Sequence, residues 1–347
     1  MNVTEASNSE LEVAVLVSDE YIEKWQRNAL ATLVAEPDID ITHIVINDRK
    51  NAPDYRCEWM TFIRNALKQI RAYPLWSFVG VARLLTPTPD YKRPVHIDSI
   101  EGLSNAERLI CSPQPDGEFW NTLPDETVDH IENVDIVVRF GFGMIKGRIL
   151  AAPKYGVLSY HPGDIRKYRG QPGGFWEFLN DEDEMGVTVQ RLNETLDGGE
   201  IAATESIDIS GVNTWQEIKK KVYSTAEGML VPAVRTLTDP DKTVVRPDQI
   251  GDLYSIPEGW AVLRYMVKNT RGRIQNYIPG EIPSPRHKWR RPSFLISLLL
   301  VGLLVVGTHP LFTHHYVVPI HIEQIVGLVI VALSIVLLFS NDHHQIT

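Results

Sequence analysis

Cysteine is scarce in this chain of 347 residues, which contains only Cys57 and Cys111. Two cysteines far apart cannot form the disulfide framework of a small secreted domain, nor a zinc site of the usual spacing. The first residues also lack a basic segment followed by an apolar stretch, so the sequence predicts no secretory signal. We therefore expect the N-terminal part of the chain to fold in the reducing environment of the cytoplasm.

A glycine-rich phosphate loop is missing as well. The first predicted strand, residues 11–17, leads into residues 18–21 (SDEY), where a dinucleotide-binding fold would have G-x-G-x-x-G. A later pair, Gly141 and Gly143, lacks the third glycine of that motif. The net charge of −10 is concentrated in the part of the chain before residue 259, which should repel nucleic acid. These features argue against a nicotinamide dinucleotide site and against a nucleic-acid partner.

Formal charge is nearly absent from the C-terminal part of the chain. Residues 293–312 contain no Asp, Glu, Lys or Arg, and residues 317–340 contain only Glu323. A helix of about twenty residues matches the roughly 30 Å thickness of the hydrocarbon core of a bilayer. Soluble helices need a polar face, and neither segment has one. The pattern predicts a hairpin of two transmembrane helices over residues 293–342.

The residues that flank the hairpin predict its orientation. The segment 286–291 is strongly basic, whereas the turn at 313–316 carries no fixed charge. Basic flanks stay on the cytoplasmic side, so we expect a two-span membrane protein with both termini in the cytoplasm. Histidines near the predicted membrane boundaries lack a cluster of thiolates or carboxylates, so we expect no metal site there. These histidines are His309, His314, His315, His321, His343 and His344.

Composition divides the chain into five segments. We expect a flexible N-terminus, a folded domain, a linker, the hairpin and a cytoplasmic tail, at residues 1–10, 11–240, 241–292, 293–342 and 343–347. Within the linker, residues 260–277 combine apolar positions with Arg and Lys in a helical pattern. This basic amphipathic helix could lie on anionic lipid or pack against the folded domain.

Alternating strand and helix patterns indicate the fold class of residues 11–240. Short runs rich in β-branched residues are typical of buried parallel strands, and longer amphipathic runs are typical of covering helices. The alternation predicts an α/β domain with an open, mostly parallel, Rossmann-like sheet. The expected strands are residues 11–17, 41–46, 95–97 and 134–139, and the expected helices are 21–36, 61–85 with an interruption at Pro74, and 122–131.

The residues with chemical potential lie between Val134 and Ile201. A strand should end at Tyr160 and place His161 at the carboxyl edge of the sheet, where open α/β sheets bind their ligands. Pro162 and Gly163 then turn the chain. Polar side chains at such an edge are candidates for an active site.

Several linked motifs in this stretch resemble the 10-formyltetrahydrofolate-dependent formyltransferases. They are His161-Pro162, the segment 168–170 (YRG), the strand at 186–188 (GVT), and residues 196–199 (LDGG), in this order. The similarity covers roughly residues 11–240 and is strongest over 134–210. It implies a formyltransferase fold and 10-formyltetrahydrofolate as the formyl donor, with no metal.

The resemblance implies a catalytic role for three positions. The family uses an Asn, a His and an Asp; His161 and Asp197 occupy the second and third positions, while Ser159 replaces the Asn. A serine has a shorter reach, so its hydroxyl could act through water, or Tyr160 or backbone N–H groups could replace it. His161 would stabilise the oxyanion and move protons, and Asp197 would orient it.

The resemblance also implies binding residues. Two walls should hold the pterin, chiefly through backbone groups: Phe140, Gly141, Phe142, Gly143, Met144 and Ile145 form one, and Leu192, Asn193 and Leu196 belong to the other. On the loop after His161, we expect Arg169, Gly170 and Asp164 to contact the acceptor. Arg166 and Lys167 could grip a phosphate or the glutamate tail of the donor.

These expectations combine into a functional hypothesis. The chain should transfer a formyl group from 10-formyltetrahydrofolate to a primary amine at the cytoplasmic membrane face. The acceptor is expected to be a small-molecule or lipid-linked amine, such as an amino sugar of an envelope glycan, with membrane lipid as a second partner. Two alternatives are a formyltetrahydrofolate hydrolase and a catalytically silent folate-binding membrane protein. The sequence does not determine the oligomeric state.

Overall fold

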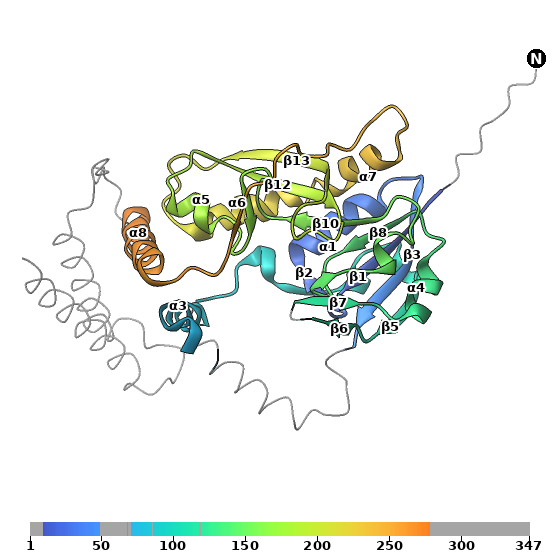
Figure 1. Ribbon diagram of the computed structural model, residues 1–347, viewed down its shortest axis with the longest axis horizontal. Helices are drawn as coiled ribbons and strands as arrows, with labels where there is room; N and C mark the ends of the chain where they lie inside the picture. Colours follow the sequence, from blue (N-terminus) through green and yellow to red (C-terminus); the bar gives the residue numbers. More distant parts are fainter. Residues whose placement is uncertain (1–9, 49–67, 69–70, 85, 118, 278–347) are drawn as a thin grey trace, which may run out of the picture. The chain divides into compact units, whose positions relative to one another are not determined.

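The computed structural model describes residues 10–48, 68, 71–84, 86–117 and 119–277 (Figure 1). The chain falls into two compact units, one up to Gly259 and one from Trp260 onward, and each is described by itself. The predicted hairpin at 293–342 and the tail at 343–347 lie outside the described residues, as does almost all of the predicted flexible N-terminus.

The first unit is organised around a sheet of seven strands. Its spatial order is β13-β12-β10-β8-β1-β3-β5, and the five strands from β10 to β5 run parallel, whereas β12 is antiparallel to both of its neighbours. The described part of the chain therefore confirms the predicted open, mostly parallel sheet. The strands span Leu11–Val17 (β1), Ile39–Asn47 (β3), Glu107–Cys111 (β5), Ile136–Arg139 (β8), Val157–His161 (β10), Glu184–Arg191 (β12) and Glu200–Asp208 (β13).

Helices cover both faces of this sheet. The crossover from β1 to β3 through α1 (Lys24–Val34) and the crossover from β5 to β8 through α4 (Asp125–Ile131) run in opposite directions along the sheet. Because such crossovers are right-handed, the two helices lie on opposite faces. Helices α6 (Trp215–Ala226) and α7 (Leu230–Thr238) contact α1, and both also contact β12 and β13 (Figure 1).

Alternation along β1 shows how the sequence fills both layers. All residues from Val13 to Val17 are fully buried. Ala14 and Leu16 belong to the core cluster that contains Val128 and Ile131 of α4. Successive side chains of a strand point to opposite faces, so Val13, Val15 and Val17 fill the other layer. A strand that is buried on both faces has to be apolar throughout, as this one is.

Short elements complete the unit. Three small sheets pair β2 (Tyr21–Glu23) with β4 (Pro94–His96), β6 (Gln114–Asp116) with β7 (Trp120–Thr122) and β9 (Met144–Ile145), and β11 (Tyr168–Gly170) with β14 (Asp252–Tyr254). The described residues also form helices α3 (Pro74–Leu84) and α5 (Phe175–Leu179) and 3-10 turns at Asp90–Lys92, Ile97–Ser99, Leu103–Asn105 and Arg148–Leu150.

Several predicted elements begin or pair differently in the structure. The helix predicted from residue 21 begins at Lys24, because Glu23 and Gln26 form a capping box there and residues 21–23 pair with β4. The helix predicted from residue 122 begins at Asp125, after Pro124. The strand predicted at 95–97 is β4, which lies outside the central sheet.

The predicted interruption at Pro74 is found in the described residues. Residues 68, 71 and 72 are helical, Tyr73 is not, and α3 begins at Pro74, as expected of a residue that tolerates only the first turn of a helix. The preceding residues of the predicted helix, 61–67, lie outside the described residues.

The described part of the second unit is a single helix. Helix α8 (Gly259–Tyr277) coincides with the helical pattern predicted at 260–277. Among the described residues, no helix is both long and apolar enough to cross a bilayer.

Candidate active site

Strand β10 carries two of the predicted catalytic residues. Ser159 and His161 are separated by one residue, so their side chains leave the same face of the strand. Both are buried, with 2% and 4% of their surface exposed. On one side Ser159 pairs in parallel register with Arg139 at the end of β8, and on the other side His161 pairs with Thr188 of β12. The carboxyl end of β10 thus lies within the sheet, between two strands.

The structure brings His161 and Asp197 together. Nδ1 of His161 lies 3.4 Å from Oδ1 of Asp197. Asp197 precedes β13 and has a left-handed backbone, with φ of +45°. Its other oxygen accepts a hydrogen bond of 2.9 Å from the backbone N–H of Gly170, and the amide of Gln190 donates to Oδ1 over 3.4 Å. Three different segments therefore hold this carboxylate against the imidazole.

The protonation state of His161 follows from its neighbours. Nε2 lies 2.9 Å from the carbonyl oxygen of Tyr168, which can only accept, so this nitrogen carries a proton. Burial acts to lower the pKa of His161, but the hydrogen bond and charge of Asp197 outweigh it and raise the pKa above its usual value. Burial acts to raise the pKa of Asp197, and His161 lowers it overall. Below the raised pKa of His161, the pair is an imidazolium facing a carboxylate.

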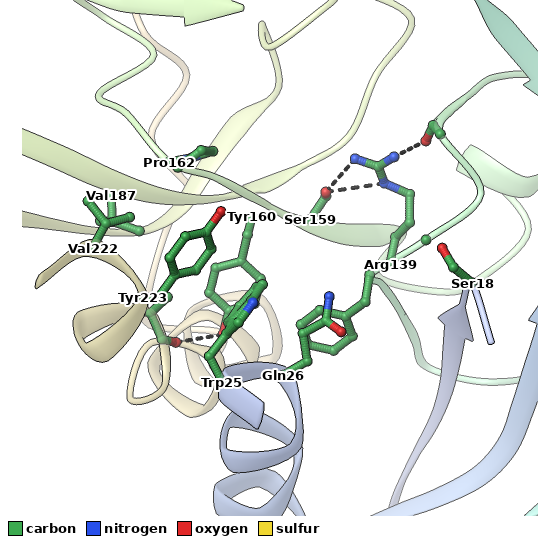
Figure 2. A pocket seen from close by; sticks show the side chains of 14 residues that line it. Ser18, Trp25, Gln26, Arg139, Ser159, Tyr160, Pro162, Val187, Val222 and Tyr223 are labelled. Atoms are coloured by element: carbon green, nitrogen blue, oxygen red, sulfur yellow. Dashed lines mark hydrogen bonds between the residues drawn. The ribbon is translucent and has the colours of Figure 1, made fainter. Parts of the chain in front are cut away.

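Ser159 has a partner that the sequence analysis did not identify. Nη2 and Nε of Arg139 donate to Oγ of Ser159 over 2.8 and 3.2 Å, and Nη1 donates to the carbonyl oxygen of Gly143 (Figure 2). Burial lowers the pKa of Arg139, while the charge of Asp197 acts to raise it. The signal was available in the sequence, because an arginine at the end of the apolar strand 134–139 needs a polar partner.

A cavity of about 350 Å³ lies beside these residues. It sits at the carboxyl ends of β1 and β8, where the strand order reverses direction and α/β sheets bind ligands. In Figure 2, Arg139 and Ser159 lie on one side of the view and the rings of Trp25 and Tyr223 on the other. The lining residues are Ser18, Trp25, Gln26, Arg139, Phe140, Gly141, Gly143, Ser159, Tyr160, Pro162, Val187, Val222, Tyr223 and Ala226.

Aromatic rings shape one wall of this cavity. Phe140 stacks on Tyr160 with ring centroids 5.7 Å apart, and Trp25 meets Tyr160 edge-on at 5.2 Å. The hydroxyl of Tyr160 donates to the carbonyl of Ala226 over 2.9 Å, which fixes the ring. Gly141 lies so close to Ser18 that a Cβ would be 2.5 Å from its backbone nitrogen. The cavity is thus lined by aromatic rings together with the glycine backbone of residues 141 and 143.

The predicted pterin walls are only partly found at this cavity. Phe140, Gly141 and Gly143 line it. The side chains of Phe142 and Ile145 are packed in the core instead, and Met144 belongs to β9. For the second wall, Leu192 packs against the core, Asn193 bonds to Gly198 and Thr195, and the carbonyl of Leu196 accepts from Arg169. None of these three lines the cavity beside Ser159.

The predicted acceptor residues have structural partners. Arg169 donates to the carbonyls of Gly251 and Leu196, over 2.7 and 3.0 Å, and so ties two loops together. Gly170 supplies the N–H that holds Asp197. Asp164 forms an ion pair with Arg166, with two atoms of that guanidinium at 2.8 and 3.0 Å. These contacts organise the site, and the cavity beside Ser159 is lined by other residues.

Two further cavities lie near the same strands. One of about 390 Å³ shares Pro162, Val222 and Tyr223 with the first cavity and contains Lys92 and Lys219. The other, of about 950 Å³, is lined by Asp164 and several glutamates, including the buried Glu177. In the described part of the chain, no group of His, Cys, Asp or Glu side chains could hold a metal ion.

A segment of the chain is similar to known proteins. Residues 117–234 match the family described as Formyl transferase. The methionyl-tRNA formyltransferase of Thermotoga neapolitana is 29% identical over 109 residues, which are 31% of this chain and 35% of that protein. The corresponding protein of Rickettsia bellii is 30% identical over 127 residues, 35% of this chain and 40% of that protein. The chain thus spans well under half the length of these relatives.

The chain also has a weak similarity to solved structures. The N-formyltransferase from Helicobacter canadensis, in complex with folinic acid and dTDP-3-aminofucose, has a TM-score of 0.43 at 11% sequence identity, over 75% of this chain and 80% of that one. The part of the present chain that matches the formyl transferase family is residues 117–234. This segment contains Arg139, Ser159, His161 and Asp197.

Proposed function

We propose, from the match of residues 117–234 to the formyl transferase family, that this protein transfers a formyl group from 10-formyltetrahydrofolate to a primary amine. One observation carries the proposal: His161 lies on β10, the strand whose Ser159 lines the cavity, and it forms an ion pair with Asp197. A buried imidazolium and its carboxylate beside a cavity at the sheet's switch point suit acid–base work on a bound carbonyl.

The reaction needs charge and proton transfers that these residues can supply. The lone pair of the amine forms a bond to the formyl carbon, and the electrons of the C=O bond move to its oxygen. The tetrahedral intermediate then collapses, the bond from carbon to N10 of the folate breaks, and that nitrogen takes a proton while the amine loses one. Preorganised positive charge stabilises the oxyanion, and His161 supplies the proton.

The position of His161 sets a condition on this step. Its ring does not line the cavity, although its neighbours Tyr160 and Pro162 do, and its Nε2 proton is engaged with the carbonyl of Tyr168. To give this proton to the substrate, the imidazole has to exchange that hydrogen bond for one to the folate. Asp197, held by Gly170, keeps the ring charged until then.

The shape of the first cavity supports a folate-type donor. A pterin is flat and aromatic, and the residues that line the cavity include the rings of Phe140 and Tyr160 and the glycines Gly141 and Gly143. A volume of about 350 Å³ is at the small end for ligand pockets. The pterin and its formyl group fit such a volume, so the glutamate tail would extend outside.

The neighbouring cavity supports an acceptor that carries a negative charge. It adjoins the first across Pro162 and Tyr223, and it combines the rings of Tyr91 and Trp215 with Lys92 and Lys219. Aromatic faces and ammonium groups together suit an amino sugar linked to a phosphate, either in a nucleotide or on a lipid carrier. A lipid carrier would agree with the membrane attachment proposed below, since tethering raises the local concentration of such a substrate.

Membrane attachment through residues 293–342 is part of the proposal. The support is the sequence pattern of two apolar runs behind a basic flank, and the site would then face the cytoplasm. The test is fractionation of cells that express the full chain. We expect the protein to stay in the membrane pellet after washing with alkaline carbonate and to dissolve in detergent, whereas release by carbonate alone would contradict the hairpin.

The test of the activity uses the purified full chain in detergent. It is incubated with 10-formyltetrahydrofolate labelled in the formyl group and with a panel of amines that includes nucleotide-linked and lipid-linked amino sugars. We expect label in an N-formyl product and stoichiometric tetrahydrofolate. Labelled formate without an acceptor would instead identify a hydrolase. Tight donor binding without any turnover would identify a silent folate-binding protein.

A further inference from the structure

Arg139 is the residue of the site that no sequence motif explained. It is the last residue of β8, and its parallel register places it beside Ser159 of β10. Its side chain lines the cavity and spans from Oγ of Ser159 to the carbonyl of Gly143 (Figure 2). A guanidinium with partners on two sides cannot swing freely. Arg139 is therefore a rigid cation in the wall of the cavity.

The contacts of Arg139 decide the direction of the Ser159 hydroxyl. Oγ of Ser159 accepts hydrogen bonds from both Nη2 and Nε of Arg139, at 2.8 and 3.2 Å. A hydroxyl oxygen has two lone pairs and one proton, so two accepted bonds occupy its acceptor capacity and leave the proton to donate. Ser159 lines the cavity while only 2% of its surface is exposed. The remaining donor is thus available to a ligand in the cavity.

The charges around Arg139 favour the same role. Burial lowers the pKa of the guanidinium, and Asp197 counteracts this effect. Asp197 also lies 3.4 Å from the imidazole of His161, so the charge of this carboxylate acts on both side chains. The positive charge of Arg139 lies next to Ser159, where it favours a carbonyl oxygen that becomes negative.

We propose that Arg139 is a positioning residue for formyl transfer, which fixes the Ser159 hydroxyl as the hydrogen-bond donor to the formyl oxygen. The inference rests on the proposed function and deepens it. When the amine bonds to the formyl carbon, the electron pair of the C=O bond moves to oxygen, and the Ser159 hydroxyl donates to that oxygen without losing its proton. When the bond from carbon to N10 breaks, the electron pair returns and the carbonyl reforms.

A double-mutant cycle separates this role from a structural one. The variants are Arg139→Met, Ser159→Ala and the two combined. Arg139→Lys is a milder change that keeps the positive charge but loses the paired N–H donors of the guanidinium. Arg246→Met is the matched control, because Arg246 is 84% exposed and is not among the residues that line the cavity. Steady-state kcat and KM are measured on the full chain in detergent, and folinic acid binding is measured by titration calorimetry.

The expected result is a loss of turnover with binding preserved. Removal of one oxyanion donor lowers kcat by about 10²- to 10³-fold, so Arg139→Met and Ser159→Ala should each fall in this range. If Arg139 acts through Ser159, the combined variant should be no slower than the slower single variant, to within about threefold. Arg139→Lys should lose less than Arg139→Met, and the dissociation constant for folinic acid should change by less than about threefold throughout.

The results that would overturn the role of Arg139 differ from those that would overturn the proposed formyl transfer. Wild-type turnover in Arg139→Met, or losses that multiply in the combined variant, would overturn the role of Arg139 and leave formyl transfer intact. A wild-type protein that forms no N-formyl product would overturn the proposed function and this inference together. Misfolding of Arg139→Met would show as loss of folinic acid binding, and the pair Arg139→Lys and Ser159→Ala then decides the question in the same way.

Discussion

Replacing Asp197 with Asn tests the central ion pair, because it removes the charge and preserves the shape. The amide oxygen can still accept from the N–H of Gly170, but the imidazolium of His161 loses its counter-ion at 3.4 Å. A hydrogen bond between charged groups contributes about 1.5 to 3 kcal/mol. Both side chains are largely buried, at 5% and 18% exposed, so solvent screens this pair little. We expect the variant to lose about 2 kcal/mol of unfolding free energy near pH 6.

The pKa shifts of His161 and Asp197 predict how the stability difference between wild type and Asp197→Asn depends on pH. The pKa of His161 is raised in the folded state, so its contribution is complete below the ordinary pKa of about 6.5 and is lost as the pH rises through the folded value. The pKa of Asp197 is lowered, so its contribution is complete above about 3.9 and is lost as the pH falls through its folded value. The difference between wild type and Asp197→Asn should be largest between about pH 4 and 6.5 and shrink toward pH 9.

The assay is urea unfolding followed by tryptophan fluorescence at pH 5.5, 7 and 9, on the full chain in detergent. The control is Asp241→Asn, which removes an exposed carboxylate on the surface. Turnover of Asp197→Asn should also fall by at least about a hundredfold. A stability difference that is the same at all three pH values, or smaller than about 0.5 kcal/mol at pH 5.5, would refute the assigned charge states.

Three further changes test other parts of the site. His161→Ala should lower turnover by at least about a hundredfold while folinic acid still binds, and wild-type kinetics would remove His161 from the mechanism. Burial raises the pKa of Glu177 to about 7, so the folded state loses stability as the pH rises from about 4.5 to 7. Glu177→Gln should therefore stabilise the protein by up to about 3 kcal/mol at pH 8 and by little at pH 4, as measured by urea unfolding, and equal gains at both would argue against a titrating Glu177. Gly170 has a φ of +85°, and a Cβ there would collide with the carbonyl oxygen of Tyr254. Gly170→Ala should cost about 2 kcal/mol and lower turnover, since the N–H that holds Asp197 would move; unchanged activity would show that this donor is dispensable.

The sequence by itself determined the layers of the fold. Within the apolar runs at residues 11–17 and 134–139, residues 13–17 and 136–138 are buried, and such runs are typical of central parallel strands in an α/β domain. The order of the motifs from His161 to Asp197 indicated the resemblance to the formyltransferases and, through it, the candidate catalytic residues. Strand existence and motif order follow from local side-chain chemistry, which a single chain displays directly.

Only the tertiary structure decided which side chains meet. The contact between Arg139 and Ser159 depends on the register of β8 against β10, and the contact between His161 and Asp197 depends on the turn that follows the antiparallel strand β12. A shift of one residue would send each side chain to the opposite face, and register is set by packing and turns far apart in the chain. For this reason the sequence indicated His161 and Asp197 by resemblance. The partner of Arg139 was identified only by the structure, which places Arg139 beside Ser159, twenty residues further along the chain.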